Sequence, residues 1–456
     1  MNFVSLSEVQ GVTEIQPLRR ELTGVSINSR TLNEGNLFVA IKGDKFDGHN
    51  FLDSAVSNGA SGVVVSRTWF AENERELNES VGIYTTVDTQ IFLGQYANLH
   101  RKLKNQPIVG ITGSNGKTTV KEMTALVLSK IGKIHKTKGN LNNHIGVPLT
   151  LLDMDDSTDF AVIEMGINHP GEMTYLCSIA EPDVALITNV ELAHTEFFGS
   201  MKQVAKAKGE LFTGMAVGGT AIVNIDDRYI KELAENLDKK LTYSLRGNAD
   251  MNGKIVRIED DSRAVIEFNG CKPFTLNVLG KKMAENAIAA AAIGLKFAVP
   301  LPDICEAIES YHGLKGRMYR IEVAGRIVID DSYNANPASV GLALSSLSAF
   351  NSSSKKIVVL GDMLELGSHS EEEHREIGRK ISFAAFDAVY AYGTESKATV
   401  DEAEKEGCKE AAHFESKEEM TERLMDFSNP GDMILVKGSR GMQMEDVIAL
   451  MGGEKN

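Results

Sequence analysis

The sequence contains little cysteine and no long apolar run. Its four cysteines in 456 residues form no Cys-x-x-Cys pair, and the gaps between them are too long for a metal knuckle. Such sparse cysteines in a long chain also argue against a disulfide framework, so we expect four reduced thiols. No apolar stretch is long enough to span a bilayer, and the first residues lack the basic and apolar regions of a signal peptide. We therefore expect a cytoplasmic protein with no membrane partner.

Basic residues are also in the minority. The chain carries 48 Lys and Arg against 63 Asp and Glu, a formal net charge of -15, which argues against a nucleic-acid-binding protein. A local positive pocket can still bind an anionic small molecule on an acidic surface. Apolar and charged fractions of 42% and 24% are typical of soluble globular chains, and the length of 456 residues predicts roughly three domains.

Residue patterns divide the chain into three α/β segments. Residues 1–85 read strand, helix, strand, which is typical of a small α/β domain. Residues 86–318 alternate apolar strands with helix-length stretches, which predicts a mostly parallel sheet covered on both faces, with a β-rich insert over 255–278. Residues 319–456 repeat the alternation in a second, Rossmann-like pattern. The predicted fold class is α/β with three domains.

Residues 112–119, TGSNGKTT, are the strongest local signal. They lie between an apolar strand and a predicted helix, as a phosphate-binding loop does, and their glycines let backbone N–H groups approach phosphate oxygens. Lys117 would reach the β- and γ-phosphates of ATP, and the Thr118 hydroxyl would bind Mg²⁺. The first glycine of the general pattern falls on Ile111, so the loop is a variant, and a turn that only caps a helix is the alternative. The candidate ATP-binding residues are Gly113, Ser114, Asn115, Gly116, Lys117, Thr118 and Thr119.

Two further candidates follow predicted strands. Glu164 ends the strand at 160–163, and His194 comes just after the strand at 184–187. Ligands of open α/β sheets bind at the carboxyl ends of strands, so both side chains could hold a phosphate-bound Mg²⁺. A solvated surface group or a hydrogen-bonded core residue is the alternative for each. The charged run KAKGE at 206–210 is predicted, from its residues alone, to be a solvated helix face.

Polar loops lie at strand ends in and before the last segment. Gly316 and Arg317 precede it, and residues 330–337, DDSYNANP, follow a predicted strand. Pro337 is expected to begin a helix. Asp, Ser, Tyr and Asn in this loop suit hydrogen bonding to a nucleotide or a peptide, although a simple turn has the same composition. Further strand-end loops are GDMLELG at 361–367 and KGSRGM at 437–442.

Together these strings resemble the Mur ligase family. The resemblance rests on GITGSNGKTT at 110–119, GNLNNHIGVP at 139–148, DSYNANP at 331–337 and GDMLELG at 361–367. The last two, with KGSR at 437–440, look like the member that joins D-alanyl-D-alanine to UDP-N-acetylmuramoyl-tripeptide. SINSR at 26–30, LFVAIKG at 37–43 and DGH at 47–49 look like the UDP-sugar domain of that member, so the resemblance covers essentially the whole chain.

The resemblance implies three domains, which bind the UDP precursor (1–85), ATP (86–318) and the incoming dipeptide (319–456). It implies an ATP-dependent, Mg²⁺-using ligase of cytoplasmic peptidoglycan precursor synthesis, and we expect a monomer. ATP would convert the terminal carboxylate of the tripeptide into an acyl phosphate, and the amine of D-Ala-D-Ala would then displace phosphate.

The resemblance also implies site residues, position by position. Lys208 matches a lysine that reacts with CO₂ to give an anionic metal ligand, which changes the interpretation of the charged run. The implied catalytic residues are Lys117, His194, Lys208 and Arg317, and the implied metal ligands are Thr118, Glu164, His194 and Lys208. Asn286 would bind the adenine, and Arg317 would contact the γ-phosphate. Asp331 would bind the nucleotide from the third domain. Ser29, Arg30 and Lys42 would line the uridine pocket, and Asn334 and Asn336 would bind substrate.

One stretch departs from the family pattern. The family usually has His-Asn ahead of the Ala-rich helix at 284–297, and Lys282 and Met283 stand there instead. This departure concerns the detail of adenine binding, not the assignment of ATP binding.

Three alternatives compete with this function. A ligase that adds diaminopimelate or lysine usually carries Asp-Asn-Pro-Arg in its third domain, and that string is absent here. The UDP-type first domain argues against a folate-polyglutamate ligase. A switch protein that hydrolyses ATP without ligation would require the third-domain motifs to be coincidental. The sequence leaves the third residue of the acceptor peptide open between diaminopimelate and lysine.

Overall fold

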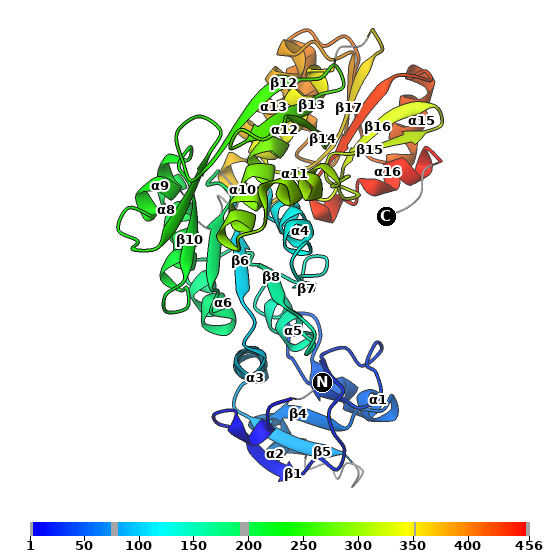
Figure 1. Cartoon of the computed structure of the whole chain (residues 1–456). Helices are drawn as coiled ribbons and strands as arrows, with labels where there is room; N and C mark the ends of the chain where they lie inside the picture. The colour runs from blue at the N-terminus through cyan, green and yellow to red at the C-terminus, as the bar shows by residue number, and fades with distance from the viewer. Residues whose placement is uncertain (1–2, 74–80, 192–199, 351–352, 453–456) are drawn as a thin grey trace. The chain divides into compact units, whose positions relative to one another are not determined.

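The structure, a computed structural model, describes residues 3–73, 81–191, 200–350 and 353–452 (Figure 1). His194, one of the predicted metal ligands, lies outside the described residues. The chain forms two compact units. The first comprises Met1–Thr112, Ile131–Leu186 and Glu210–Ala221, and the second comprises Gly113–Lys130, Ile187–Gly209 and Ile222–Asn456.

The first segment folds into a five-stranded sheet with the order β1-β5-β4-β3-β2. β2 to β5 are parallel, and β1 runs antiparallel to β5. The strands are β1 (Thr13–Gln16), β2 (Gly24–Ser26), β3 (Asn36–Val39), β4 (Gly62–Ser66) and β5 (Gly82–Thr86), and the helices are α1 (Leu52–Ser57) and α2 (Arg67–Asn73). Leu52 and Ala55 of α1 share an apolar cluster with Val63 and Val65 of β4, because alternate residues of a strand face the same side. The predicted strand–helix–strand pattern is confirmed.

The central sheet has nine strands in the order β14-β13-β12-β11-β10-β9-β6-β8-β7. β6, β8 and β7 pair in parallel, as the alternation of strands and helices predicts. The strands are β6 (Ile108–Thr112), β7 (Ile134–Lys136), β8 (Phe160–Glu164), β9 (Val184–Ile187), β10 (Thr220–Asn224), β11 (Lys240–Ser244), β12 (Met251–Ile258), β13 (Arg263–Phe268) and β14 (Phe274–Leu279). The helices of this segment are α3 (Thr89–Lys104), α4 (Lys117–Leu128), α5 (Gly146–Leu152), α6 (Glu172–Ala180), α8 (Met201–Thr213), α9 (Arg228–Leu233), α10 (Lys282–Lys296) and α11 (Leu301–Glu309).

The predicted β-rich insert is confirmed. β12, β13 and β14 form an antiparallel meander. Asn269 and Gly270 begin the connection from β13 to β14, residues 269–273, with φ angles of 42° and 78°. Two successive positive φ angles suit a tight hairpin turn, which is why Asn-Gly is a strong sequence signal for one.

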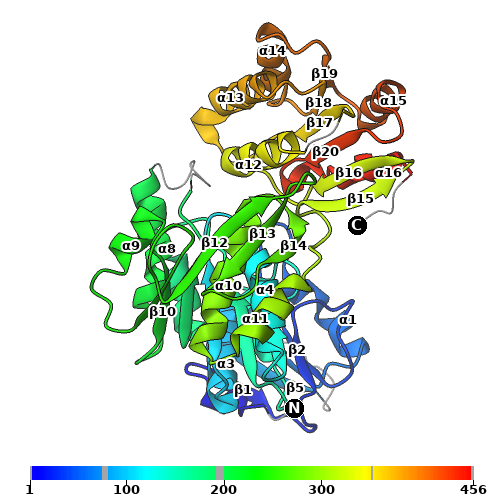
Figure 2. The same ribbon diagram turned by 45° about the horizontal axis from the view of Figure 1, so that its top comes forward.

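The third segment forms a six-stranded sheet with the order β15-β16-β20-β17-β18-β19, parallel except for β15. Val358 and Leu360 of β17 face a cluster that includes α12 and α13, whereas Ile357 and Val359 face α15 and α16. Figure 2 shows these two helix pairs on opposite sides of the sheet. The elements are β15 (Tyr319–Val323), β16 (Arg326–Asp331), α12 (Pro337–Ser348), β17 (Lys356–Gly361), α13 (Ser370–Phe383), β18 (Ala388–Tyr392), α14 (Lys397–Lys405), β19 (Ala411–Phe414), α15 (Lys417–Phe427), β20 (Met433–Lys437) and α16 (Glu445–Leu450).

Helix starts follow local chemistry. Asp88 caps α3 by accepting hydrogen bonds from the backbone N–H groups of Gln90 and Ile91. Pro337 is the first residue of α12, as predicted, and Asn336 caps that helix in a capping box. Among the described residues, no helix combines the length and apolar character needed to cross a membrane. The predicted α/β fold class is confirmed.

Candidate active site

The predicted phosphate loop joins the end of β6 to the start of α4. Gly113 and Gly116 have φ angles of 146° and 82°, which residues with side chains rarely adopt. A Cβ on Gly113 would lie 1.8 Å from Thr188 Oγ1, and one on Gly116 would lie 2.4 Å from Asn286 Oδ1. Both positions therefore require glycine, for conformation and for space. The loop leads directly into the N-terminus of α4, where the helix dipole favours an anion.

Residues 188–191, which follow β9, hold this loop by hydrogen bonds. Ser114 N donates to Asn189 O at 3.0 Å, and Asn115 N donates to Asn189 Oδ1 at 3.0 Å. Ser114 Oγ donates to Glu191 O at 2.8 Å. Asn189 and Glu191 are not among the predicted site residues, although their place just after a buried strand is a signal for them.

Lys117 folds its side chain back over the loop. Its Nζ donates to Gly113 O at 2.8 Å and to Ser114 O at 3.3 Å. Thr118 and Thr119 are buried in the first turn of α4. The structure thus brings the loop residues and the Lys117 ammonium together in one place, as a phosphate site requires.

Lys208 is buried within α8. Its side chain is 3% exposed, whereas Lys206 in the same charged run is exposed. The prediction of a solvated helix face is therefore wrong for Lys208. Burial, together with the positive charge of Lys117, holds the pKa of Lys208 well below its usual range. A lowered pKa raises the fraction of Lys208 that is a neutral amine, which is the form that can react with CO₂.

The candidate donors for Mg²⁺ are oxygen atoms, except for the ring nitrogen of His194. Glu164 ends β8 in the first unit, is 2% exposed and accepts a hydrogen bond from Asn142 Nδ2 at 2.8 Å. Thr118 would add a hydroxyl, and CO₂ on Lys208 would add a carbamate oxygen. These donor types fit Mg²⁺, which prefers oxygen ligands. Among the described residues, no group of three or more His, Cys, Asp or Glu side chains could hold a metal, and the fourth predicted ligand, His194, lies outside them.

Asp331 and Arg317 are held by neighbours near the start of the third sheet. Lys437 Nζ lies 2.6 Å from Asp331 Oδ2, and Met318 N donates to Asp331 Oδ1 at 3.0 Å. Burial raises the pKa of Asp331, although the charge of Lys437 acts in the opposite direction. The Arg317 guanidinium lies 4.0 Å from the centre of the Tyr333 ring, a cation–π contact. The nucleotide contacts of Asp331 and Arg317 stay a prediction.

Asn336 contacts the phosphate loop directly. Its Nδ2 donates to Asn115 Oδ1 at 3.0 Å, and its Oδ1 accepts from Ser339 N at 2.8 Å as the cap of α12. Asn334 lies in the same strand-end loop, where its carbonyl oxygen accepts a hydrogen bond from Lys437 Nζ at 2.8 Å. The structure therefore places Asn336 at the phosphate loop, and the substrate contacts of Asn334 and Asn336 stay a prediction.

Asn286 and the two departing residues lie at the start of α10. Asn286 is 3% exposed, and its Nδ2 contacts Met283 Sδ at 3.6 Å, a weak acceptor. Its Oδ1 faces Gly116. Lys282 Nζ lies 3.0 Å from Glu191 Oε1 and 2.6 Å from Glu285 Oε2. Asn286 thus lies against Gly116 of the phosphate loop, and its contact with adenine stays a prediction.

The predicted uridine-side residues lie in the first unit. Ser29 is 6% exposed, and its carbonyl oxygen accepts a hydrogen bond from Asn58 Nδ2 at 2.8 Å. Arg30 is exposed, and Lys42 forms an isolated β-bridge with Asp47. Their contact with substrate stays a prediction.

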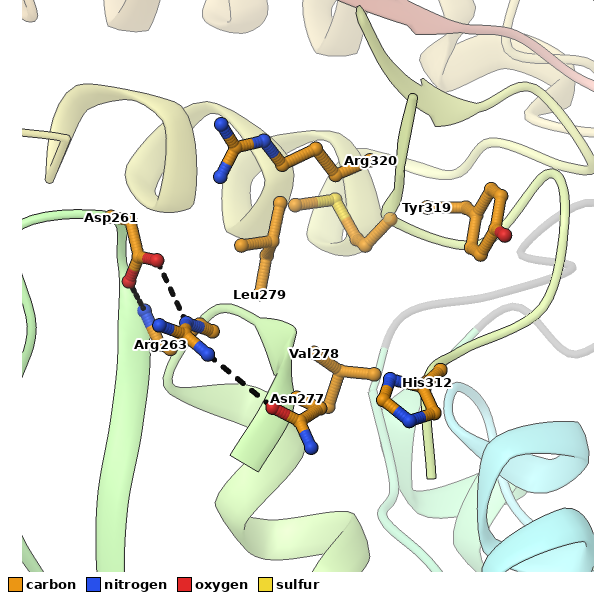
Figure 3. Close-up of a pocket in the computed structure, with 9 residues that line it drawn as sticks. Asp261, Arg263, Asn277, Val278, Leu279, His312, Tyr319 and Arg320 are labelled. Carbon is orange, nitrogen blue, oxygen red and sulfur yellow. Dashed lines mark hydrogen bonds and ion pairs between the residues drawn. The ribbon is translucent and has the colours of Figure 1, made fainter. Parts of the chain in front are cut away.

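A polar cavity of about 410 Å³ lies beside β13, β14 and β15 (Figure 3). Arg263 donates there to Asp261 Oδ2 at 2.7 Å and to Asn277 Oδ1 at 3.3 Å. None of the predicted site residues lines this cavity. Its lining includes Met318, whose backbone N–H donates to the predicted site residue Asp331.

Three family models match the chain. The Mur ligase family, catalytic domain, matches residues 21–101; the Mur ligase middle domain matches 111–294; and the Mur ligase, glutamate ligase domain, matches 316–440. A curated protein from Haemophilus influenzae is 35% identical over 98% of this chain and 97% of its own length. This chain belongs to the Mur ligase family. The resemblance seen in the sequence is confirmed.

Two similar curated Mur ligases carry the same protein name. The Haemophilus influenzae protein and one from Bacillus subtilis, 35% identical over 93% of this chain and 92% of its own length, are each named UDP-N-acetylmuramoyl-tripeptide--D-alanyl-D-alanine ligase. A crystal structure of MurF from Acinetobacter baumannii superposes with a TM-score of 0.86, at 31% identity and 98% coverage of both chains. A MurF ligase from Thermotoga maritima in complex with ADP superposes with a TM-score of 0.79, at 28% identity, covering 95% of this chain and 97% of that one.

Proposed function

We propose that this chain is an ATP-dependent ligase that joins D-alanyl-D-alanine to UDP-N-acetylmuramoyl-tripeptide, giving ADP and phosphate. The observation that carries the proposal is the phosphate loop, whose two glycines leave no room for a Cβ and whose backbone is held by residues 188–191. Similarity over almost the whole chain to relatives of that name supports the choice of substrates.

The reaction needs ATP because a carboxylate is a poor electrophile. Transfer of the γ-phosphoryl group to the terminal carboxylate of the tripeptide forms an acyl phosphate and ADP. The amine of D-Ala-D-Ala then attacks the acyl carbon, a C–N bond forms, the C–O bond to phosphate breaks, and the amine loses a proton. The protein contributes positioning and neutralises negative charge on the transferred group.

Specific side chains and backbone groups would bind the phosphates and neutralise their negative charge. Lys117 and the backbone N–H groups of the phosphate loop would bind the β- and γ-phosphates, because the loop opens at a helix N-terminus. Arg317 would contact the γ-phosphate, and its contact with Tyr333 limits the positions its guanidinium can take. Asp331 would bind the nucleotide from the third domain.

Magnesium would be held by the Thr118 hydroxyl, Glu164, His194 and a carbamate on Lys208. When bound, Mg²⁺ neutralises phosphate charge. The buried Lys208 amine supports this proposal, since its lowered pKa favours the neutral form that takes up CO₂.

Each of the three predicted domains has a proposed ligand. Residues 1–85 would bind the UDP precursor through Ser29, Arg30 and Lys42. Residues 86–318 would bind ATP, and residues 319–456 would bind the dipeptide through Asn334 and Asn336. We propose a monomer that acts in the cytoplasm, where ATP and the UDP-linked precursor are present.

A phosphate-release assay tests the function. We expect release that requires ATP, UDP-tripeptide and D-Ala-D-Ala together, and mass spectrometry of the product should find the pentapeptide. Hydrolysis of ATP that does not depend on either acceptor would instead support a switch protein. Defined tripeptides ending in diaminopimelate or lysine then identify the preferred third residue.

A further inference from the structure

Lys282 lies between two carboxylates. Its Nζ is 3.0 Å from Glu191 Oε1 and 2.6 Å from Glu285 Oε2. The side chains of Lys282 and Glu191 are 18% and 24% exposed, so water screens this group only in part. The cluster has two negative charges and one positive charge.

Glu191 also contacts the phosphate loop. Asn115 Nδ2 donates to Glu191 Oε2 at 2.6 Å. Glu191 N donates to Ser114 Oγ at 3.0 Å, and Ser114 Oγ donates to Glu191 O. Glu191 is therefore bonded to two neighbouring residues of the loop, through its backbone and through its side chain.

This position creates an electrostatic conflict. A carboxylate that is hydrogen-bonded to the loop helps to orient Asn115, but its negative charge opposes the binding of an anionic nucleotide to the same loop. Burial acts to lower the pKa of Lys282, but the charges of Glu285 and Glu191 outweigh it and raise that pKa. The ammonium is therefore charged at neutral pH and offsets the charge of Glu191.

We propose that Lys282 is a positioning residue of the nucleotide site: its ammonium neutralises Glu191, so that Glu191 orients Asn115 without repelling the phosphates. The inference rests on the proposed ATP-binding function. Lys282 stands where the family usually has His, so the ion pair between Lys282 and Glu191 lies in a stretch in which the chain departs from its family.

Binding of ADP, measured by calorimetry, tests the proposal without any need for ligase activity. Lys282→Met keeps the aliphatic stem and removes the charge, and we expect ADP to bind about three- to tenfold more weakly at low salt. The difference should shrink as salt is added, because salt screens charge. Lys282→Arg should retain most of the affinity.

Lys281→Met is the matched control. Lys281 is the preceding residue, is exposed, and has no side-chain ion pair or hydrogen bond among the described residues. Its replacement removes the same formal charge, but from a side chain that is not paired with Glu191. ADP affinity should therefore stay within about twofold of that of the unaltered chain.

The decisive variant is the double one, Lys282→Met with Glu191→Gln. The amide oxygen that Glu191→Gln introduces would still accept from Asn115 but carries no charge, so ADP affinity should return to within about twofold of the unaltered chain. Affinity that stays as weak as in Lys282→Met would overturn the proposal, since Lys282 would then act on the nucleotide and not through Glu191. If Lys282 acted in folding alone, Lys282→Met would lower the unfolding midpoint without a salt-dependent change in ADP affinity. That result would also overturn the proposal. If the unaltered chain bound no ADP, both the proposed function and this inference would fail.

Discussion

The side-chain amide of Asn336 donates a hydrogen bond to Asn115 Oδ1 at 3.0 Å, across 221 residues of sequence. Asn336 at the same time caps α12 by accepting from Ser339 N. One residue thus begins a helix beside the third sheet and contacts the phosphate loop.

Replacing Asn336 separates these two roles. Asn336→Asp keeps the capping oxygen but loses the donor to Asn115 and adds a negative charge beside the loop. We expect ADP affinity to fall about three- to tenfold, while the free energy of unfolding changes by less than about 0.5 kcal/mol. Asn336→Ala, the control, should lose about 1 kcal/mol of stability in urea unfolding, because the cap is gone. Unchanged ADP binding by Asn336→Asp would show that the contact with Asn115 has no part in the site.

Gly116→Ala should damage the site more than an equivalent glycine elsewhere. The new Cβ would lie 2.4 Å from Asn286 Oδ1, at a φ of 82°. Gly270 is the matched control, since its φ is 78° and nothing lies within 4 Å of an added Cβ. We expect Gly270→Ala to cost about 1–2 kcal/mol from backbone strain alone. Gly116→Ala should cost roughly a further 1 kcal/mol and lose ADP binding. Equal stability losses, with ADP binding intact, would contradict the crowding argument.

Lys208 should be required for activity through a carbamate. Lys208→Ala should lose phosphate release, and Lys208→Glu should restore part of it, because Glu supplies a carboxylate near the position of the carbamate. Lys206→Ala, on the exposed side of the same run, is the control and should retain activity. Depletion of bicarbonate should reversibly inhibit the unaltered chain but not Lys208→Glu. Full activity of Lys208→Ala would exclude the carbamate role.

The buried Lys208 amine also predicts a pH dependence of stability in carbonate-free buffer. Its pKa is lowered from the usual 10.5, so between the folded-state pKa and 10.5 the unfolded chain binds more protons than the folded chain. Stability should therefore rise with pH across that window and fall as pH drops toward the folded-state value. Lys208→Met removes this slope, so the difference in urea midpoint between the two proteins should change from pH 7 toward the usual pKa of 10.5. Parallel pH profiles would mean that Lys208 keeps an ordinary pKa.

Cys271 and Cys305 should form a disulfide under oxidation. Their Sγ atoms lie 3.2 Å apart, on the β13–β14 turn and on α11. Diamide would take one hydrogen from each thiol as the S–S bond forms. Closure of the loop between residues 34 apart should stabilise the chain by up to about 3–4 kcal/mol. Burial raises the pKa of Cys305 to about 12, so the reaction should be faster in alkali. Peptide mapping should find this cross-link and leave Cys177, whose pKa burial also raises to about 12, as a thiol. Alkylation of all four cysteines after diamide treatment would refute the pairing.

Much of the fold could be predicted from local pattern. The buried strand β9 is confirmed at the predicted residues 184–187, because short apolar runs between turn signals have few other stable forms. The short strands β2 and β7 were not predicted, since every residue in them is only partly buried and they lack an apolar signal. β15 was also missed, because burial alternates along this edge strand and it contains no continuous apolar run.

The sequence by itself determined the features that depend on neighbours along the chain: the phosphate loop, the start of α12 at Pro337, the β-rich insert and the family. Tertiary structure alone decided the features that depend on burial and on residues far apart in sequence. Lys208 belongs to a charged run whose composition is typical of a solvated helix face, yet packing removes this side chain from water and lowers its pKa. Glu191 and Lys282 lie 91 residues apart, and only the fold brings their charges within hydrogen-bond distance. Charge and solvation are properties of the surroundings in space, and a linear pattern does not contain them.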